Sequence, residues 1–323
     1  MKAIVYHHYG SPDVIQYEEV EKPTAGDNQV LIKVHAASVN PLDWHYLRGK
    51  PYIMRLQSGL RIPKDPRLGA DVAGVVETVG KAVTEFKPGD AVFGSCSGAF
   101  AEYACVREKA LVKKPDNVTF AQAAAVPVAA FTALQGLRDH GQLQPGQQVL
   151  INGAAGGVGT FAVQIAKALG ATVTGVCSTR NVELVRSLGA DQVIDYTKTD
   201  FTQSGQRFDL FLDCIGNHSL TACRRVLQPQ GAYVIVGGPD GQWLGPLTRG
   251  VKAVVLDRFV KEKLILFIAK TTKADLVFMR DLMVEGKVKP VIDRCYPLPE
   301  TAEAIRYLET GRARGKVIIG VSQ

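Results

Sequence analysis

The sequence predicts an α/β protein in which a doubly wound parallel sheet is joined to a compact β unit. Two changes of pattern along the 323 residues support this prediction. Up to about residue 120, short β-like runs are separated by turn residues. From about residue 147, strands that are apolar on both faces alternate with helical stretches, which is typical of a parallel sheet covered on both sides.

The composition excludes several classes of protein. Hydrophobic residues make up 46% and charged residues 21%, whereas disordered chains combine low hydrophobicity with high net charge. No apolar run approaches the roughly 20 residues of a spanning helix, and the N-terminus reads as a strand instead of a targeting segment. Six cysteines without a Cys-x-x-Cys pair fit isolated thiols in a reducing compartment. We therefore expect a cytoplasmic protein without a membrane partner.

The net charge of +7 favours a basic enzyme, or one that binds a polyanionic cofactor. A basic chain can also bind nucleic acid. However, the 38 basic residues are scattered among 31 acidic ones, with no run of five or more. A nucleic-acid partner is therefore the weaker interpretation.

The β unit is predicted from both ends of the chain. In the first part, turn residues such as those at 88–90 separate four expected strands, over 30–36, 72–79, 91–94 and 100–106. Near the C-terminus we expect strands over 288–293 and 316–321 and a helix over 301–310. If the last strand rejoins the first ones, the β unit spans residues 1–122 and 288–323, and the α/β domain spans 123–287.

Within the α/β domain, strands and helices alternate. The expected strands cover 148–152, 172–177, 192–196, 208–214 and 232–236, and the expected helices cover 158–169, 182–188 and 220–227. Gly170 ends the first of these helices, as a C-terminal glycine commonly does.

A glycine-rich turn between the first strand and the first helix predicts a bound dinucleotide. Glycines let a pyrophosphate approach the backbone, and the helix N-terminus supplies free N–H donors. The register reads Ala154-x-Gly156-x-x-Gly159, with alanine in the first position and an additional glycine before it. The expected contacts are Gly153, Ala154, Ala155, Gly156, Gly157, Val158 and Gly159.

The residues after the second strand favour NADPH over NADH. A carboxylate there would bind the ribose 2′-hydroxyl of NAD, but the chain reads Ser178-Thr179-Arg180. Two hydroxyls and a guanidinium suit a 2′-phosphate, although a helix cap with a solvated arginine is the alternative. Tyr196, at the end of the next strand, is a candidate to cover the adenine, with a buried sheet-end tyrosine as the alternative.

This layout resembles the medium-chain dehydrogenase/reductase superfamily, and within it the zinc-free quinone oxidoreductase group that includes zeta-crystallin-like and reticulon-4-interacting-protein-like members. The resemblance spans essentially the whole chain. It is strongest at residues 72–80, 87–92, 153–159 and 315–318. It implies a GroES-like β domain, a Rossmann domain that binds NADPH, and commonly a homodimer.

The resemblance also implies that no metal is bound. Zinc-containing members place Cys, His and Cys at positions that match Asn40, Ala70 and approximately Val128. None of these residues offers the thiolate or imidazole that zinc prefers. The four-cysteine structural lobe of the zinc-containing members is missing as well.

Candidate catalytic residues follow from the resemblance. Asn40 and Asp43 match active-site polar positions, although both would equally cap a helix that begins near Pro41. His45 stands where enone-reducing relatives tend to carry lysine, and it could donate a proton near neutral pH. Further cofactor contacts are expected from Thr132, Gly216, Gly237 and Lys316, with close backbone packing as the alternative for the glycines.

Without a Lewis acid, hydride transfer to an electron-poor acceptor fits better than alcohol oxidation. We therefore predict an NADPH-dependent reductase of quinones or activated alkenes, such as enones and 2-alkenals. Two alternatives stay open: an alcohol or carbonyl dehydrogenase of the same fold, and a non-catalytic NADPH-binding protein with a crystallin-like or RNA-binding role. Residues 48–66 and 239–273 are expected to shape the pocket.

Overall fold

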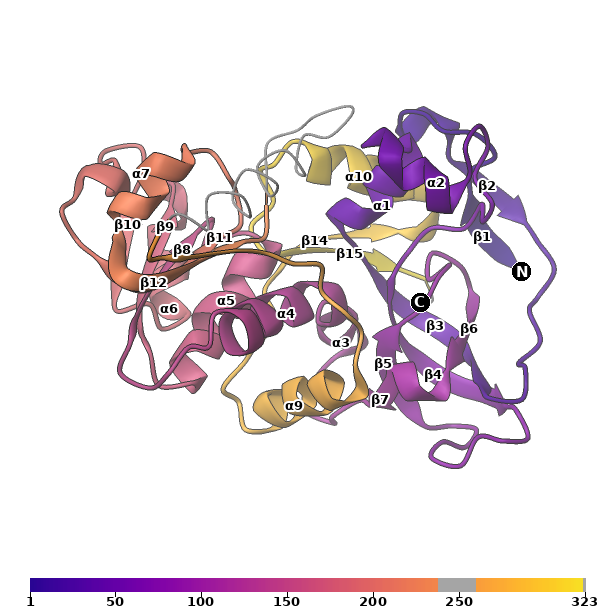
Figure 1. Cartoon of the computed structure of the whole chain (residues 1–323). Coiled ribbons are helices and arrows are strands. Elements are labelled where there is room, and N and C mark those ends of the chain that lie inside the picture. The colour runs from indigo at the N-terminus through magenta and orange to yellow at the C-terminus, as the bar shows by residue number, and fades with distance from the viewer. Residues whose placement is uncertain (238–259, 322–323) are drawn as a thin grey trace. The chain divides into compact units, whose positions relative to one another are not determined.

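The computed structural model describes residues 1–237 and 260–321, and contacts divide the chain into two compact units. Unit 1 comprises Met1–Ala129 and Thr271–Gln323, and unit 2 comprises Ala130–Lys270 (Figure 1). The second boundary precedes α9 (Lys273–Val284), whereas the sequence analysis placed it after residue 287. The reason is that α9 packs on β7 (Leu111–Lys113) of unit 1, where Asn117 Nδ2 donates to the Met283 carbonyl at 3.0 Å.

Unit 1 is built on a mixed sheet with the strand order β14-β15-β3-β4-β5-β7, and β6 also pairs with β3. β14 and β15 are parallel, and the other pairs are antiparallel. The terminal strand β15 pairs with β3, so the chain does rejoin its N-terminal β unit, as expected. The strands, with the hairpin β1-β2, are β1 (Lys2–Val5), β2 (Gln16–Glu19), β3 (Gln29–Val39), β4 (Asp71–Val79), β5 (Ala91–Ser95), β6 (Tyr103–Arg107), β7, β14 (Ile292–Pro297) and β15 (Lys316–Gly320).

Short helices connect these strands. They are α1 (Pro41–Arg48), α2 (Arg55–Ser58), α3 (Phe120–Ala124), α9 and α10 (Thr301–Glu309), while α4 (Pro127–Leu134) crosses the boundary between the units. The strand expected over 288–293 is wrong in position: β14 begins at Ile292, where it pairs with Lys316 of β15. Pairing with the terminal strand, and not local hydrophobicity, fixes where β14 lies.

Unit 2 contains a parallel sheet with the strand order β10-β9-β8-β11-β12-β13 in its described residues. This is the doubly wound order, which confirms the predicted fold class. The strands are β8 (Gln148–Asn152), β9 (Thr172–Cys177), β10 (Gln192–Asp195), β11 (Phe208–Asp213), β12 (Leu227–Ile235) and β13 (Lys263–Leu266). The helices are α5 (Gly157–Ala168), α6 (Val182–Ser187) and α7 (Leu220–Arg225), and a π-helical stretch (Gln135–His140) continues α4.

The parallel arrangement positions the candidate cofactor residues. The carboxyl ends of β8, β9, β10, β11 and β12 lie at one edge of the sheet, and ligands of such sheets bind outside this edge. In the described residues, every helix is too short or too polar to cross a bilayer.

Candidate functional site

The turn after β8 requires two glycines, one for its backbone conformation and one for the close packing of the following helix. Gly153 has φ +80, which lets the chain turn sharply so that the N–H of Ala154 reaches the Val176 carbonyl at 3.0 Å. A Cβ on Gly159 would lie 2.1 Å from the Gly153 carbonyl oxygen, so helix α5 can pack this closely on the turn only with glycine there. Ala154 is fully buried and fills the position where the common motif has its first glycine.

Gly156 is different, because the fold itself does not require a glycine there. It caps α5 with φ −82 and ψ 179, an extended conformation that any residue adopts. A Cβ would meet only the Gly153 carbonyl oxygen, at 3.4 Å, which is ordinary contact. The missing side chain leaves open the N-terminus of a 12-residue helix, where a pyrophosphate finds N–H donors and a positive dipole end. This turn therefore fits a dinucleotide.

The residues after β9 form a corner with Asp195 and Lys198, which were not among the expected cofactor contacts. Thr179 Oγ1 donates to Asp195 Oδ2 at 2.6 Å, because β10 ends beside β9 and brings this acid to the corner. Hydrogen bonds, first from Thr179 and then from Thr197, lower the pKa of Asp195 to about 2, so the acid is ionised at neutral pH. Lys198 lies 3.6 Å from the same carboxylate, and Arg180 is exposed nearby in the chain.

Two cations and one carboxylate leave this corner with a net positive charge among its described residues. Asp195 and Lys198 were not among the expected contacts, because they lie at the end of the third strand and not of the second. Tyr196 is 56% exposed, so the alternative of a buried sheet-end tyrosine is wrong. An exposed ring at this strand end leaves a face for stacking.

A buried aspartate organises the next part of the same edge. Asp213 ends β11, and its Oδ1 accepts from Asn152 Nδ2 at 2.9 Å, from Ile215 N at 3.1 Å and from Gly216 N at 2.8 Å. Its Oδ2 accepts from the Tyr233 hydroxyl at 2.6 Å. The carboxylate thus holds the turn that contains Gly216. The signal in the sequence was a polar residue directly after a buried apolar strand.

Gly237 and Thr132 complete the expected cofactor residues of unit 2. A Cβ on Gly237 would lie 2.1 Å from the Cys214 carbonyl oxygen, so close backbone packing accounts for this glycine. Thr132 is half-buried within α4. The geometry thus brings the turn, the corner and Gly216 to one edge of the sheet, and it places Thr132 on a helix.

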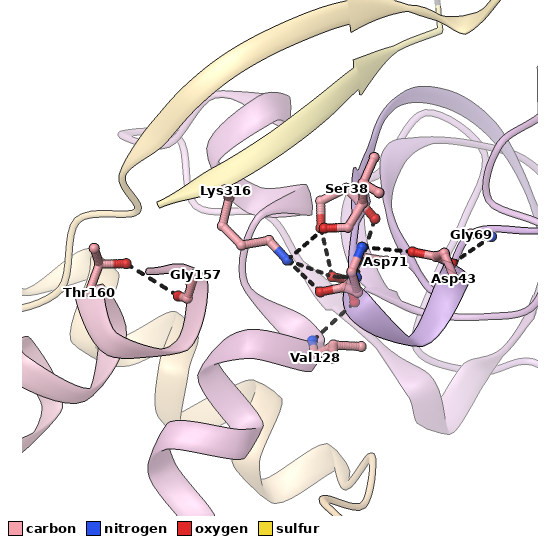
Figure 2. A network of polar contacts seen from close by, with 10 residues as sticks. Ser38, Asp43, Gly69, Asp71, Val128, Gly157, Thr160 and Lys316 are labelled. Atoms are coloured by element: carbon pink, nitrogen blue, oxygen red, sulfur yellow. Dashed lines mark hydrogen bonds and ion pairs between the residues drawn. The ribbon is translucent and has the colours of Figure 1, made fainter. Parts of the chain in front are cut away.

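In unit 1, several of the expected site residues meet at Asp71 (Figure 2). Asp71 is fully buried at the start of β4. Its Oδ2 accepts from Ser38 Oγ at 2.7 Å and from Asn40 Nδ2 at 2.8 Å, and its Oδ1 accepts from the Val128 N–H at 3.0 Å. Asp71 has little signal in the sequence, because it is an isolated acid before an apolar strand.

Lys316 belongs to this network, which we call the Asp71 network (Ser38, Asn40, Asp71, Lys316 and the Val128 N–H). Its ammonium donates to Asn40 Oδ1 and lies 3.7 Å from Asp71 Oδ2. Burial lowers the pKa of Lys316, and the facing carboxylates oppose this shift. Lys316 was expected to contact the cofactor, whereas in the structure its ammonium is engaged within unit 1. Both ends of the Asn40 amide are likewise engaged by protein groups.

Asp43 is the titratable group beside this network. Its Oδ2 accepts from the Asn40 N–H at 2.7 Å and its Oδ1 from the Gly69 N–H at 3.1 Å, so Asn40 and Asp43 do cap α1, as the alternative interpretation held. Asp43 is only 3% exposed. Burial, with a smaller contribution from the Asp71 charge, raises the pKa of Asp43 to about 7 in spite of the two N–H donors.

Asp43 also lines a hollow of about 350 Å³ in unit 1, a size suited to a small ligand. Leu42, Tyr46 and Leu68 give it apolar and aromatic walls. Its other lining residues are Tyr6, Gln57, Ser58, Lys64, Asp65, Arg67, Gly69, Ala70, Cys96 and Ser97. Burial raises the pKa of Cys96 to about 12, so its thiol is not a nucleophile at neutral pH.

His45 does not join Asp43 at this hollow. Its Nδ1 lies 2.8 Å from the Lys50 carbonyl oxygen, and its ring packs against Trp44 with 3.8 Å between the ring centroids. Of the described residues that line the hollow, none is a histidine. Tyr46, one helical position further along, contributes its partly exposed ring instead.

The positions that would carry zinc ligands hold none of the usual ligand types. Asn40 donates to Asp71, Ala70 lines the hollow, and Val128 meets Asp71 through its backbone only. Within residues 1–237 and 260–321, no group of three His, Cys, Asp or Glu side chains comes together as a metal site would require. The expectation of a zinc-free site stays a prediction.

Comparison with known proteins identifies the class to which this fold and site belong. The alcohol dehydrogenase GroES-like domain matches residues 26–116, and the family described as zinc-binding dehydrogenase matches residues 188–319. A quinone oxidoreductase from Coxiella burnetii has a similar structure, with a TM-score of 0.87 and 32% identity over 100% of this chain and 99% of that chain. The class is therefore that of the two-domain dehydrogenases and reductases.

Two curated relatives narrow this class. The chloroplast envelope quinone oxidoreductase homolog of Arabidopsis thaliana is 36% identical over 99% of this chain and 98% of its own length. The chloroplastic NADPH-dependent alkenal/one oxidoreductase of the same plant is 38% identical over 99% of this chain and 79% of its own length. The chain belongs to the quinone oxidoreductase group of the medium-chain dehydrogenase/reductase superfamily, as the sequence analysis predicted.

Proposed function

We propose that this chain is an NADPH-dependent, zinc-independent reductase that transfers hydride to quinones or activated alkenes. The observation that carries the proposal is the open turn at Gly156, which has room for a pyrophosphate at the N-terminus of α5. Relatives that match 99% of the chain are named as a quinone oxidoreductase homolog and as an NADPH-dependent alkenal/one oxidoreductase. They support the choice of cofactor and of acceptor.

The residues of unit 2 would hold NADPH in three places. The N–H groups of the turn at 153–159 would bind the pyrophosphate. The net positive corner at Arg180 and Lys198 would bind the 2′-phosphate, and the exposed Tyr196 ring would stack on the adenine. When bound, NADPH supplies the hydride.

The hollow in unit 1 is the proposed acceptor site. Reduction of a quinone or enone adds a hydride from the cofactor and a proton from elsewhere. Asp43 lines the hollow, and burial raises its pKa to about 7, so its protonated form is present near neutral pH. We propose that Asp43 supplies that proton to the acceptor, with Tyr46 packing against it. Asn40 and Lys316 would act as positioning residues, since protein groups already engage their side chains.

One plate of NADPH-oxidation assays tests this function. It compares 1,2- and 1,4-quinones, 2-alkenals and enones, and a parallel plate follows NADP⁺ reduction with primary and secondary alcohols. We expect turnover on the first plate only. Turnover with alcohols alone would favour the alcohol dehydrogenase alternative, and NADPH binding without consumption of any acceptor would favour a binding protein.

Three further properties belong to the same proposal. Zinc independence predicts that elemental analysis finds far less than one zinc per chain and that activity survives treatment with EDTA. Sedimentation should give the mass of a homodimer, and β13, which ends the sheet among the described residues, is a candidate for its interface. Fractionation of the source cells in high-salt buffer should recover the protein from the cytoplasm.

A further inference from the structure

A surface rich in exposed apolar side chains lies beside the hollow. Half of the large apolar side chains that are exposed in the described residues fall between residues 42 and 62. Ile53, Leu56, Leu60 and Ile62 have 46%, 68%, 68% and 66% of their surface exposed. They belong to a single turn of 3-10 helix (Tyr52–Met54), to α2 and to the loop that follows, near α1 in Figure 1. Exposed apolar side chains concentrated in one stretch of chain are typical of a surface that contacts another molecule.

The same stretch concentrates positive charge. Residues 50–64 contain no acid and account for four of the net seven positive charges, through Lys50, Arg55, Arg61 and Lys64. In the described part of the chain, none of the four pairs with a carboxylate. By contrast, the flanking Arg48 and Arg67 pair with Glu309 and Asp65. Arg55 is engaged by the Gly49 and Arg48 carbonyls and stacks on tyrosine rings, which leaves Lys50, Arg61 and Lys64 as the cations interleaved with the four exposed apolar side chains.

We infer that residues 50–64, the basic-apolar segment, dock this protein peripherally on an anionic lipid bilayer. Apolar side chains of such segments enter the boundary between headgroups and acyl chains, and cations beside them attract anionic headgroups. An anionic bilayer satisfies both features of the segment, whereas an apolar protein surface would leave these charges unpaired. The expectation of no membrane partner came from the lack of a spanning run, which has no bearing on peripheral docking.

Docking would bring the hollow to the lipid surface. Gln57, Ser58 and Lys64 of the basic-apolar segment line the hollow, together with Leu42 and Tyr46 of α1. This part of the inference rests on the proposed function. The acceptors would be quinones or long-chain enones dissolved in the bilayer, and the docked enzyme would bind them directly from the lipid.

Vesicle sedimentation tests the docking without cofactor or acceptor. The full chain is mixed with phosphatidylcholine vesicles that contain either no anionic lipid or 30% phosphatidylglycerol, at low and at high salt. Two variants remove the proposed contacts, Leu56→Ser with Leu60→Ser and Lys50→Gln with Arg61→Gln. Two matched variants change exposed residues elsewhere, Ile268→Ser, whose side chain is 86% exposed, and Lys87→Gln with Lys109→Gln.

We expect binding to the anionic vesicles only, lost at high salt. The loss of two cations should weaken it by about 30-fold, and the control variants should bind like the wild type. Binding to neither kind of vesicle, or equal weakening by the controls, would overturn the inference. So would a mass in light scattering that falls when Leu56 and Leu60 are replaced, because the surface would then join two copies of the chain.

Activity assays separate this inference from the proposed function. Residues 48–66 were expected to shape the pocket, so each variant is compared by the ratio of two turnover rates. In the Leu56/Leu60 and Lys50/Arg61 variants, turnover of a long-chain quinone embedded in anionic vesicles should fall at least tenfold more than turnover of a water-soluble quinone or enone without vesicles. No turnover of any acceptor, with vesicle binding intact, would refute the reductase but not the docking. Equal loss with soluble and embedded acceptors would refute the lipid-dissolved substrate class.

Discussion

Replacement of Gly156 by alanine should separate cofactor binding from folding. The backbone at this position is extended, and the new Cβ would meet only one atom, at 3.4 Å. Glycine-to-alanine changes at compatible positions stabilise a protein by about 0.4–1 kcal/mol, but alanine is a poorer N-cap than glycine by a similar amount. For a protein of this size we therefore expect the melting temperature to stay within about 4 °C of the wild type.

NADPH affinity should change much more than stability. The added methyl group would occupy the space at the N-terminus of α5 that the pyrophosphate needs, and it would separate the anion from the N–H donors. A hydrogen bond to a charged group contributes about 1.5–3 kcal/mol, so the loss of one corresponds to an increase in Kd of about 10- to 150-fold. Fluorescence titration with NADPH measures this change, and differential scanning fluorimetry measures the melting temperature.

Gly159→Ala is the matched control, because there the fold itself excludes a side chain. Its Cβ would lie 2.1 Å from the Gly153 carbonyl oxygen, and overpacking of this kind costs about 1–3 kcal/mol. This variant should lose stability as well as binding. The reasoning about Gly156 would be refuted by wild-type NADPH affinity in Gly156→Ala, or by a loss of stability as large as that of Gly159→Ala.

Three other substitutions test the remaining parts of the site. Arg180→Ala should raise the Kd for NADPH about tenfold or more in titrations and leave the Kd for NADH unchanged. An equal loss of affinity for NADPH and NADH would show that Arg180 does not bind the 2′-phosphate. Since burial holds the pKa of Asp43 near 7, the protonated acid is lost as pH rises through 7, so kcat/KM should fall above that pH. Asp43→Asn should be slow, and its kcat/KM should not fall above pH 7. If the pH dependence of kcat/KM in this variant is the same as in the wild type, Asp43 is excluded as the proton donor. Lys316→Met should lower the free energy of unfolding in urea by about 3–5 kcal/mol, because it leaves Asp71 buried and unpaired. A second change, Asp71→Asn, should restore part of that loss, and strictly additive losses would speak against the ion pair.

The fold was predictable wherever local pattern and pairing agree. β8 and β9 have the predicted bounds, because buried parallel strands are apolar on both faces and end at glycines or polar residues. β12 was predicted five residues too short at its N-terminal end. Its extra residues pair with β11 across a register shift between Phe208 and Leu210, and no local pattern encodes such a shift.

The candidate site was predictable in part, for a related reason. The turn at 153–159 is continuous in sequence, so its residues and their chemistry could be read together. The Asp71 network joins β3, β4 and β15, which are far apart in sequence, and only the sheet order reveals that Lys316 lies against Asn40. Asp195 was missed likewise, since it reaches the cofactor corner from the neighbouring strand.

The Asp71 network also constrains which group in unit 1 can exchange a proton with an acceptor. A buried carboxylate with its cation removed is costly, so Asp71 and Lys316 stabilise each other in the buried network with Asn40. Asp43 has no cation of its own within ion-pair distance among the described residues. Its carboxyl group can therefore gain or lose a proton without leaving a buried cation unpaired. Because Asp43 also caps α1, transfer of its proton to an acceptor leaves a carboxylate. This carboxylate accepts stronger hydrogen bonds from the Asn40 and Gly69 N–H groups than the neutral acid does. The same helix cap that makes Asp43 look structural is thus what would stabilise its ionised form after proton transfer.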